Sequence, residues 1–316
     1  MTLAVSACLL GEMIRFDGGH KHDRFITDEL GQFVRCVPFC PEHLAFGTPR
    51  PSVRLVRNGS GAIRVRSNKD GTDLTEALLR ESSAELERIA AERLCGIIFK
   101  SKSPSCGMKS AKLYLENGSC EGKEDGVFAS LCRERFGNLP MEEEGRLQDM
   151  WLRENFVMQV FAYARFEEFK AADPDIKALV RFHTEHKFLL QSKNETLYRR
   201  LGNVVANRDG LPFEHLLERY EELFKTAIGH KSSIKRTRNV LEHMAGFFKN
   251  DLSSEEKAIL HGQIRDYAEK IIPLIVPLST LHLYATKYRN AYLLEQRFLN
   301  PYPKNLALRS HLDAGK

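Results

Sequence analysis

The order of the strands and helices predicted for the N-terminal third of the chain is the feature that most constrains its fold. Residues 3–10 (LAVSACLL), 36–40 (CVPFC) and 96–100 (GIIFK) are short apolar runs that predict buried strands. Residues 72–94 carry leucine and isoleucine at helical spacing and predict an amphipathic helix. Because this helix lies between strands, we expect a parallel sheet with helices packed on its faces.

The pattern changes at residues 138–146 (NLPMEEEGR), where a turn is followed by three acids and a glycine. Beyond this point the hydrophobic spacing is almost entirely helical. Helices are predicted over residues 147–171, 174–192, 195–207, 213–228, 232–249, 254–271 and 279–298. A single core stops growing near ~250–300 residues, so a chain of 316 residues favours two domains. We therefore expect an α/β domain over residues 1–145, with a Rossmann-like parallel sheet and flanking helices, followed by an all-α domain over residues 146–316.

The cysteines are unevenly distributed and favour the cytoplasm. All seven lie in the first half of the chain, and an odd number argues against a disulfide framework. Only seven residues precede Cys8 and none is basic, so a secretory signal does not fit. No apolar run approaches the ~18 residues that span a bilayer. We expect a cytoplasmic protein without a membrane partner.

Three cysteines follow predicted strands closely. Cys8, Cys40 and Cys106 each lie at or just past the end of such a strand. Since ligands of parallel sheets bind beyond the carboxyl ends of the strands, these thiols are expected to meet there. Thiolates favour iron–sulfur clusters, zinc or copper(I), so one interpretation is a metal site. The other is that cysteines act as small buried apolar residues, which is our assignment for Cys95, Cys120 and Cys132.

Polar residues surround these cysteines. Asp17 lies beside a pair of glycines, where it either lines a site or caps a turn. Glu42 follows Cys40 by two residues and either transfers protons or begins a helix. Ser101 and Ser103 lie in residues 100–107 (KSKSPSCG), which also contain Cys106. From the residues alone, this stretch could be a polar turn, a nucleophile or one corner of a metal site.

Positive charge is concentrated in the second half of the chain. Residues 1–145 hold 20 lysines and arginines against 21 acids, whereas residues 146–316 hold 27 against 21. Residues 226–249 gather several of these cations, namely Lys231, Lys235, Arg236 and Arg238. They either contact a phosphate backbone or form the solvated basic faces of helices.

Three motifs together resemble the thiouracil desulfidase family. They are SACLLGEMIRFDGG (6–19), PFCPE with GTPRP (38–51) and SKSPSCG (101–107). The resemblance extends from residue 1 to about residue 145. NVLEHMAGFF (239–248), IIPLIVPLSTL (271–281) and EQRFLNPYP (295–303) resemble a helical domain of unknown function that is fused behind it in some relatives.

The resemblance implies a 4Fe-4S cluster that is held by three cysteines and has one open iron. Carried over by motif, the ligands are Cys8, Cys40 and Cys106. Glu42 and Ser101 are implied catalytic groups, and Ser103 competes with Ser101 for its role. Asp17 and Arg50 are possible substrate-binding residues. The sequence AFGTPRP departs from the family pattern, because many relatives have a second glycine before Pro-Arg, and this leaves the role of Arg50 open.

The implied activity is hydrolytic removal of sulfur without net electron transfer. For the fused form, the implied substrate is 4-thiouridine in transfer RNA, whose base has to leave its stack to reach the iron. The single-domain relatives imply free thiolated nucleobases such as thiouracil, which we keep as the alternative. A second alternative is a non-catalytic iron–sulfur or zinc protein that binds RNA or senses redox state. The sequence carries no signal for an oligomeric state.

Overall fold

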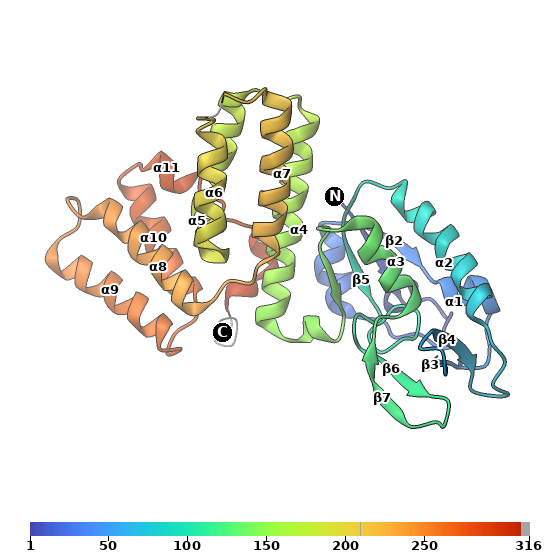
Figure 1. Ribbon diagram of the computed structural model, residues 1–316. Coiled ribbons are helices and arrows are strands. Elements are labelled where there is room, and N and C mark those ends of the chain that lie inside the picture. The colour runs from blue at the N-terminus through green and yellow to red at the C-terminus, as the bar shows by residue number, and fades with distance from the viewer. Residues whose placement is uncertain (209, 311–316) are drawn as a thin grey trace. The chain divides into compact units, whose positions relative to one another are not determined.

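The computed structural model describes residues 1–208 and 210–310, and the chain divides into two compact units (Figure 1). The first comprises Met1–Gln148, and the second begins at Asp149. The first unit combines a parallel sheet with flanking helices, and the second is built from helices. The predicted fold class is therefore confirmed.

The first unit is built on a four-stranded parallel sheet with the order β2-β1-β5-β8. Its strands are β1 (Thr2–Ser6), β2 (Arg35–Phe39), β5 (Leu94–Phe99) and β8 (Met141–Glu143). The helices of this unit are α1 (Pro41–Phe46), α2 (Thr75–Ala90) and α3 (Val127–Phe136).

A cluster of aromatic rings packs α3 against the carboxyl ends of two strands. Phe39 of β2 and Phe99 of β5 lie 5.6 Å apart between ring centroids, and Phe128 of α3 lies 4.9 Å from Phe39. All three side chains are buried. Burying each ring stabilises the fold by about 1.5–3 kcal/mol. The cluster therefore anchors the strand ends from which the cysteine loops leave.

Several element boundaries differ from those predicted. The apolar run 3–10 is strand only to Ser6, and a 3-10 helix over Ala7–Leu10 follows, which ends where Gly11 takes φ +96°. The predicted helix 72–94 is shorter, because it begins at Thr75 and ends at Ala90. The acidic run at the predicted boundary also contains β8 at the edge of the sheet, and the first unit ends at Gln148, close to the predicted residue 145.

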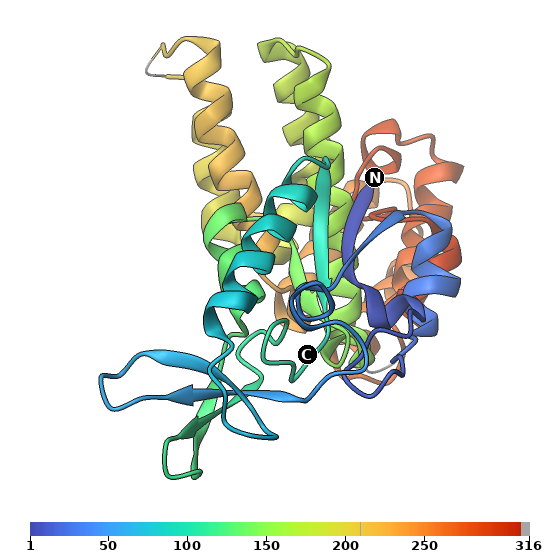
Figure 2. The same ribbon diagram turned by 90° about the vertical axis from the view of Figure 1, so that its right-hand side faces the viewer.

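A second sheet was missed altogether. Its order is β4-β3-β6-β7, from β3 (Val53–Arg57), β4 (Ile63–Ser67), β6 (Ala111–Leu115) and β7 (Cys120–Glu124). Figure 2 shows its two hairpins extending side by side from the first unit. Asn58-Gly59 and Asn117-Gly118 lie in the two connections, and Asn-Gly between alternating residues is a strong hairpin signal. Cys120 of β7 is exposed, so its assignment as a buried apolar residue is wrong, whereas Cys95 and Cys132 are buried.

The second unit contains eight α-helices in its described residues. They are α4 (Met150–Ala171), α5 (Ile176–Lys193), α6 (Glu195–Val205), α7 (Phe213–Gly229), α8 (Ile234–Ala245), α9 (Ser254–Ala268), α10 (Ile275–Lys287) and α11 (Ala291–Leu294). The single helix predicted over 279–298 is wrong, because the chain turns at Arg289, whose φ is +53°. Ser253 caps α9 in a capping box with Glu256. None of the helices in the described residues is long and apolar enough to cross a bilayer.

Buried polar groups tie the second unit together. The carboxylate of Glu154 accepts from Arg309 Nε at 2.7 Å and from the Tyr302 hydroxyl at 3.1 Å. The ammonium of Lys193 is buried and donates to Asn155 Oδ1 at 2.6 Å. Such groups are costly to bury unless they are hydrogen-bonded, so these contacts fix how α4, α5 and the C-terminal segment pack.

Candidate active site

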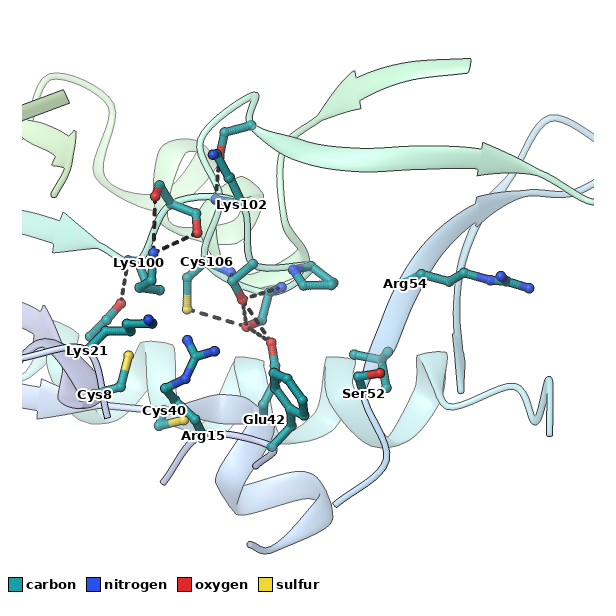
Figure 3. Close-up of a pocket in the computed structure, with 18 of the residues that line it drawn as sticks. Cys8, Arg15, Lys21, Cys40, Glu42, Ser52, Arg54, Lys100, Lys102 and Cys106 are labelled. Atoms are coloured by element: carbon teal, nitrogen blue, oxygen red, sulfur yellow. Dashed lines mark hydrogen bonds between the residues drawn. The ribbon is translucent and has the colours of Figure 1, made fainter. Parts of the chain in front are cut away.

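A cavity of about 770 Å³ opens in the first unit, beyond the carboxyl ends of β1, β2 and β5 (Figure 3). Its lining includes the three cysteines that were selected because each follows a predicted strand, Cys8, Cys40 and Cys106. Cys8 lies in the 3-10 helix after β1, and Cys40 directly precedes α1. Cys106 lies in the loop that follows β5. No other cysteine lines this cavity among the described residues.

Burial controls the protonation of these thiols. It raises the pKa of Cys8 to about 11 and that of Cys40 to about 12. It also raises the pKa of Cys106 well above its usual value. Lys100 and Arg15 oppose the effect at Cys8, because each places a positive charge nearby. The bare thiols are thus protonated at neutral pH, and binding a metal would deprotonate them.

The donor set consists of three thiols, which suits a soft metal centre. Within residues 1–208 and 210–310, no group of three His, Cys, Asp or Glu side chains could hold one metal ion. In an iron–sulfur cluster each cysteine binds a different iron, so its ligands stand farther apart than those of one ion. Figure 3 shows the three thiols around one end of the cavity.

Glu42 connects the two loops that carry Cys40 and Cys106. Its Oε1 accepts from Ser103 Oγ at 2.9 Å and from Ser105 Oγ at 2.6 Å. The Ser105 hydroxyl also lies 3.4 Å from Cys106 Sγ. The predicted Glu42 and Ser103 therefore share one network. Ser105 was not selected from the sequence, because nothing in KSKSPSCG distinguishes its hydroxyl from the other two.

Arg50 lines the cavity, but its guanidinium is almost fully buried and engaged by neighbouring groups. Its side chain is 3% exposed, and its Nη2 donates to Glu42 Oε2 at 3.1 Å. Its Nη1 donates to the carbonyl oxygens of Gly47 at 2.8 Å and Ile14 at 3.0 Å. The guanidinium therefore fixes Glu42 and two backbone segments. Its Nε has no hydrogen-bond partner among the described residues.

Ser101 belongs to a different network. Its hydroxyl donates to Glu144 Oε1 at 2.9 Å, and its backbone N–H donates to Glu144 Oε2 at 2.6 Å. Lys100 Nζ donates to the Ser101 hydroxyl oxygen at 3.1 Å and pairs with the same carboxylate. Ser101 and Ser103 were considered for the same catalytic role, but they hydrogen-bond to different acids, Glu144 and Glu42. Glu144 was missed because it lies in the acidic run interpreted as a boundary.

Asp17 caps a turn at the cavity's edge. Its carboxylate accepts from the Gly19 N–H at 3.1 Å, and that hydrogen bond lowers its pKa. Asp17 does not line the cavity, but the adjacent Arg15 and Phe16 do. The contacts favour the capped turn, and substrate binding by Asp17 remains a prediction.

The second sheet supplies a basic outer wall to the cavity. Arg54, Lys112 and Lys123 line it, and these cations form no ion pair among the described residues. The Arg54 guanidinium lies 5.8 Å from the centroid of the Tyr114 ring, which also lines the cavity. Figure 3 shows Arg54 at the end away from the cysteines. These residues were missed together with their sheet.

The basic residues predicted to contact RNA lie at the start of α8 in the second unit. Lys231, Lys235 and Arg238 are exposed. Arg236 donates to the carbonyl oxygens of Ser192 at 3.2 Å and Lys231 at 2.6 Å, so it ties α8 to the end of α5. A phosphate contact by these four residues remains a prediction.

The chain resembles known proteins in both units. The sequence model of the 2-thiouracil desulfurase family matches residues 3–144, and that of DUF1722, a family of unknown function, matches residues 187–303. The resemblance identified from the sequence is thereby confirmed. The uncharacterized protein YbgA of Escherichia coli (strain K12) is 25% identical over 154 residues, which cover 48% of this chain and 91% of YbgA. The solved structure of the [4Fe-4S]-dependent thiouracil desulfidase TudS matches with 29% identity and a TM-score of 0.38, covering 46% of this chain and 93% of TudS.

Proposed function

Because residues 3–144 form a domain of the 2-thiouracil desulfurase family, we propose that this chain removes sulfur from a thiolated pyrimidine such as free thiouracil. The observation that carries the proposal is one cavity lined by three thiols, two buried and one partly buried, and by the serines of two acid–serine networks. Thiols can hold a metal centre that binds sulfur, and acids with hydroxyls can move protons.

Cys8, Cys40 and Cys106 would hold the iron–sulfur cluster. With three cysteine ligands, a 4Fe-4S cluster has one iron open to ligands, and this iron supplies a Lewis acid with a preference for sulfur. The family match supports this assignment, and so does the convergence of the three cysteines on one cavity.

The proposed reaction is a hydrolysis. Water attacks the ring carbon, a carbon–oxygen bond forms, the carbon–sulfur bond breaks and sulfur leaves as hydrogen sulfide. Two protons move from water to sulfur and no electrons are gained or lost. The chain therefore needs groups that accept and return a proton, and it needs no reductant.

We assign Glu42 to accept the proton from the attacking water. Arg50 fixes one carboxylate oxygen, and two serine hydroxyls fix the other. Both hydroxyls donate their hydrogens to Glu42, and Ser103 Oγ accepts from the N–H groups of Ser105 and Cys106. The Ser105 oxygen is therefore the acceptor left to orient a water. Positioned general bases of this kind typically contribute 10²–10⁴-fold to a rate.

We assign Lys100 and Ser101 to the opposite side of the site. Lys100 lies close enough to Cys8 to lower the pKa of that thiol, so its positive charge offsets the negative charge of bound thiolates. Ser101 lines the cavity and can hydrogen-bond the pyrimidine.

The basic outer wall favours a second candidate, 4-thiouridine within transfer RNA. Arg54, Lys112 and Lys123 lie where a phosphate attached to the bound base could reach them. A base in a folded RNA would have to leave its stack to enter the cavity. The family description names thiouracil, so the free base remains the leading proposal.

One experiment compares the two candidates. Protein reconstituted without oxygen is mixed with 2-thiouracil, 4-thiouracil or transfer RNA that contains 4-thiouridine, and hydrogen sulfide and thiocarbonyl absorbance are followed. Turnover of the free bases supports the leading proposal, and preference for the RNA supports the second. If all three compounds persist, the chain is not a desulfidase of this class.

A further inference from the structure

We propose that Glu144 is a positioning residue for Ser101 and Lys100 in this site. The inference rests on the proposed function and adds a residue that neither the cysteine motifs nor Glu42 suggests. Its carboxylate accepts from three groups, the Ser101 hydroxyl, the Ser101 N–H and the Lys100 ammonium. Its side chain is only 13% exposed, so water competes weakly for these hydrogen bonds.

The sheet fixes the position of Glu144. β8 pairs in parallel with β5, in a register that puts Phe99 opposite Glu143. The Glu144 N–H then donates to the Phe99 carbonyl at 3.1 Å, which brings the acid beside the first residues of the next loop. Glu144 therefore reaches Lys100 and Ser101 through backbone pairing rather than through a flexible linker.

The hydrogen bonds determine which way the Ser101 hydroxyl faces. Its hydrogen is donated to Glu144, and one oxygen lone pair accepts from Lys100. The remaining lone pair can only accept. Ser101 is thereby set as an acceptor for an N–H or O–H of the molecule in the cavity. Without Glu144, the hydroxyl could rotate and the Lys100 ammonium would lose its counter-charge.

The adjacent acid holds the other end of the same loop. Glu143 accepts from the Met108 N–H at 2.7 Å and from the Ser110 hydroxyl. The two acids therefore hold the segment that carries Cys106 at both ends. Glu142 differs, because its carboxylate pairs with Arg146 at 2.6 Å and forms no hydrogen bond to this loop within the described part of the chain. It offers a matched control two residues away in the same acidic run.

The test compares Glu144→Gln, Glu144→Asp and the control Glu142→Gln in the full-length reconstituted protein. Glutamine keeps the shape of Glu144, but its NH₂ cannot accept from the Ser101 N–H or from Lys100. We expect Glu144→Gln to lower kcat about 10- to 100-fold while KM changes less than about threefold, with iron content as in wild type and a lower Tm, because Lys100 loses its counter-charge. Glu144→Asp should recover part of the loss, and Glu142→Gln should match wild type.

A double variant and a readout independent of activity complete the test. Ser101→Ala with Glu144→Gln should lose less activity than the two single losses combined, because Glu144 acts in part through Ser101. Amide hydrogen exchange of the peptide over residues 100–107 should quicken in Glu144→Gln and stay unchanged in Glu142→Gln. Unchanged exchange, or additive losses in the double variant, would overturn the proposal. If the wild type lacks desulfidase activity, the proposed function fails, and hydrogen exchange still decides whether Glu144 holds this loop.

Discussion

Glu42 Oε1 accepts a hydrogen bond from Ser105 Oγ at 2.6 Å, although 63 residues separate them in the chain. The contact joins the segment that follows β2 to the loop that follows β5. Both segments carry a cysteine of the cavity, Cys40 and Cys106. An acid, a hydroxyl and two thiols therefore meet at the carboxyl edge of the parallel sheet, where such sheets place their ligand sites.

Replacing one cavity cysteine should remove the cluster. Cys106→Ser takes away one of three proposed ligands, so we expect the iron and sulfide content to fall to a small fraction of wild type and activity to be lost. Iron and sulfide assays with an absorption spectrum measure this. Cys120→Ser is the control, because that thiol is exposed on β7. Equal iron content in both variants would exclude Cys106 as a ligand.

Glu42→Gln should keep the cluster and lose catalysis. The amide can still bond to its neighbours but cannot take a proton from water, so we expect kcat to fall about 10²–10⁴-fold. Single-turnover release of hydrogen sulfide measures the effect. Glu121→Gln is the control, since that acid only pairs with Arg57 on the second sheet. A Glu42→Gln enzyme with wild-type kcat would place the base elsewhere.

Arg50→Ala should destabilise the first unit. The change leaves the buried Glu42 carboxylate without its ion-pair partner and frees two backbone carbonyls. Breaking a buried pair by removing one partner costs about 3–5 kcal/mol, so calorimetry should show a lower Tm. Arg57→Ala, which removes a more exposed pair, should lower the Tm much less. Equal shifts for both variants would contradict the role of Arg50.

Lys193 should make the stability of the second unit depend on pH. Burial lowers the pKa of Lys193 from 10.5 to about 7. Between these two values the unfolded chain binds more protons at this lysine than the folded chain, so stability from this group rises with pH over that window. Below about pH 7 the buried lysine is charged and this contribution is lost. Chemical unfolding from pH 6 to 10 should show the rise in wild type and in Lys177→Met, but a smaller one in Lys193→Met.

The basic outer wall should contribute to the binding of thiolated RNA and little to the turnover of a free base. Changing Arg54, Lys112 and Lys123 together to alanine removes three cations from the cavity lining. We expect KM for thiolated transfer RNA to rise at least tenfold and its salt dependence to weaken, while turnover of thiouracil stays within about threefold. Equal effects on both substrates would show that the wall does not recognise phosphate.

The part of the site that follows from strand order could be predicted from the sequence. Cys8, Cys40 and Cys106 were selected because each follows a predicted strand, and the ends of parallel strands share one edge. Glu42 was selected because it follows Cys40 by two residues in the sequence. These inferences need only local periodicity and one topological rule.

The part that depends on pairing between distant segments could not be predicted. β3 and β6 each carry a basic residue between two apolar ones, and only their pairing shows that Arg54 and Lys112 line the same cavity. Glu144 reaches Ser101 because β8 joins the sheet at its edge, whereas a three-residue strand leaves no periodic signal. The contacts of Arg50 could not be predicted either, because the sequence does not show that its side chain is buried.

The most direct test of the central claim measures cofactor and reaction in one sample. The chain is purified and reconstituted without oxygen, its iron and sulfide are counted, and thiouracil is added while hydrogen sulfide is collected. The account predicts roughly four irons and four sulfides per chain, with release of hydrogen sulfide that disappears in Cys106→Ser. A colourless, zinc-loaded protein, or full turnover by metal-free protein, would contradict it.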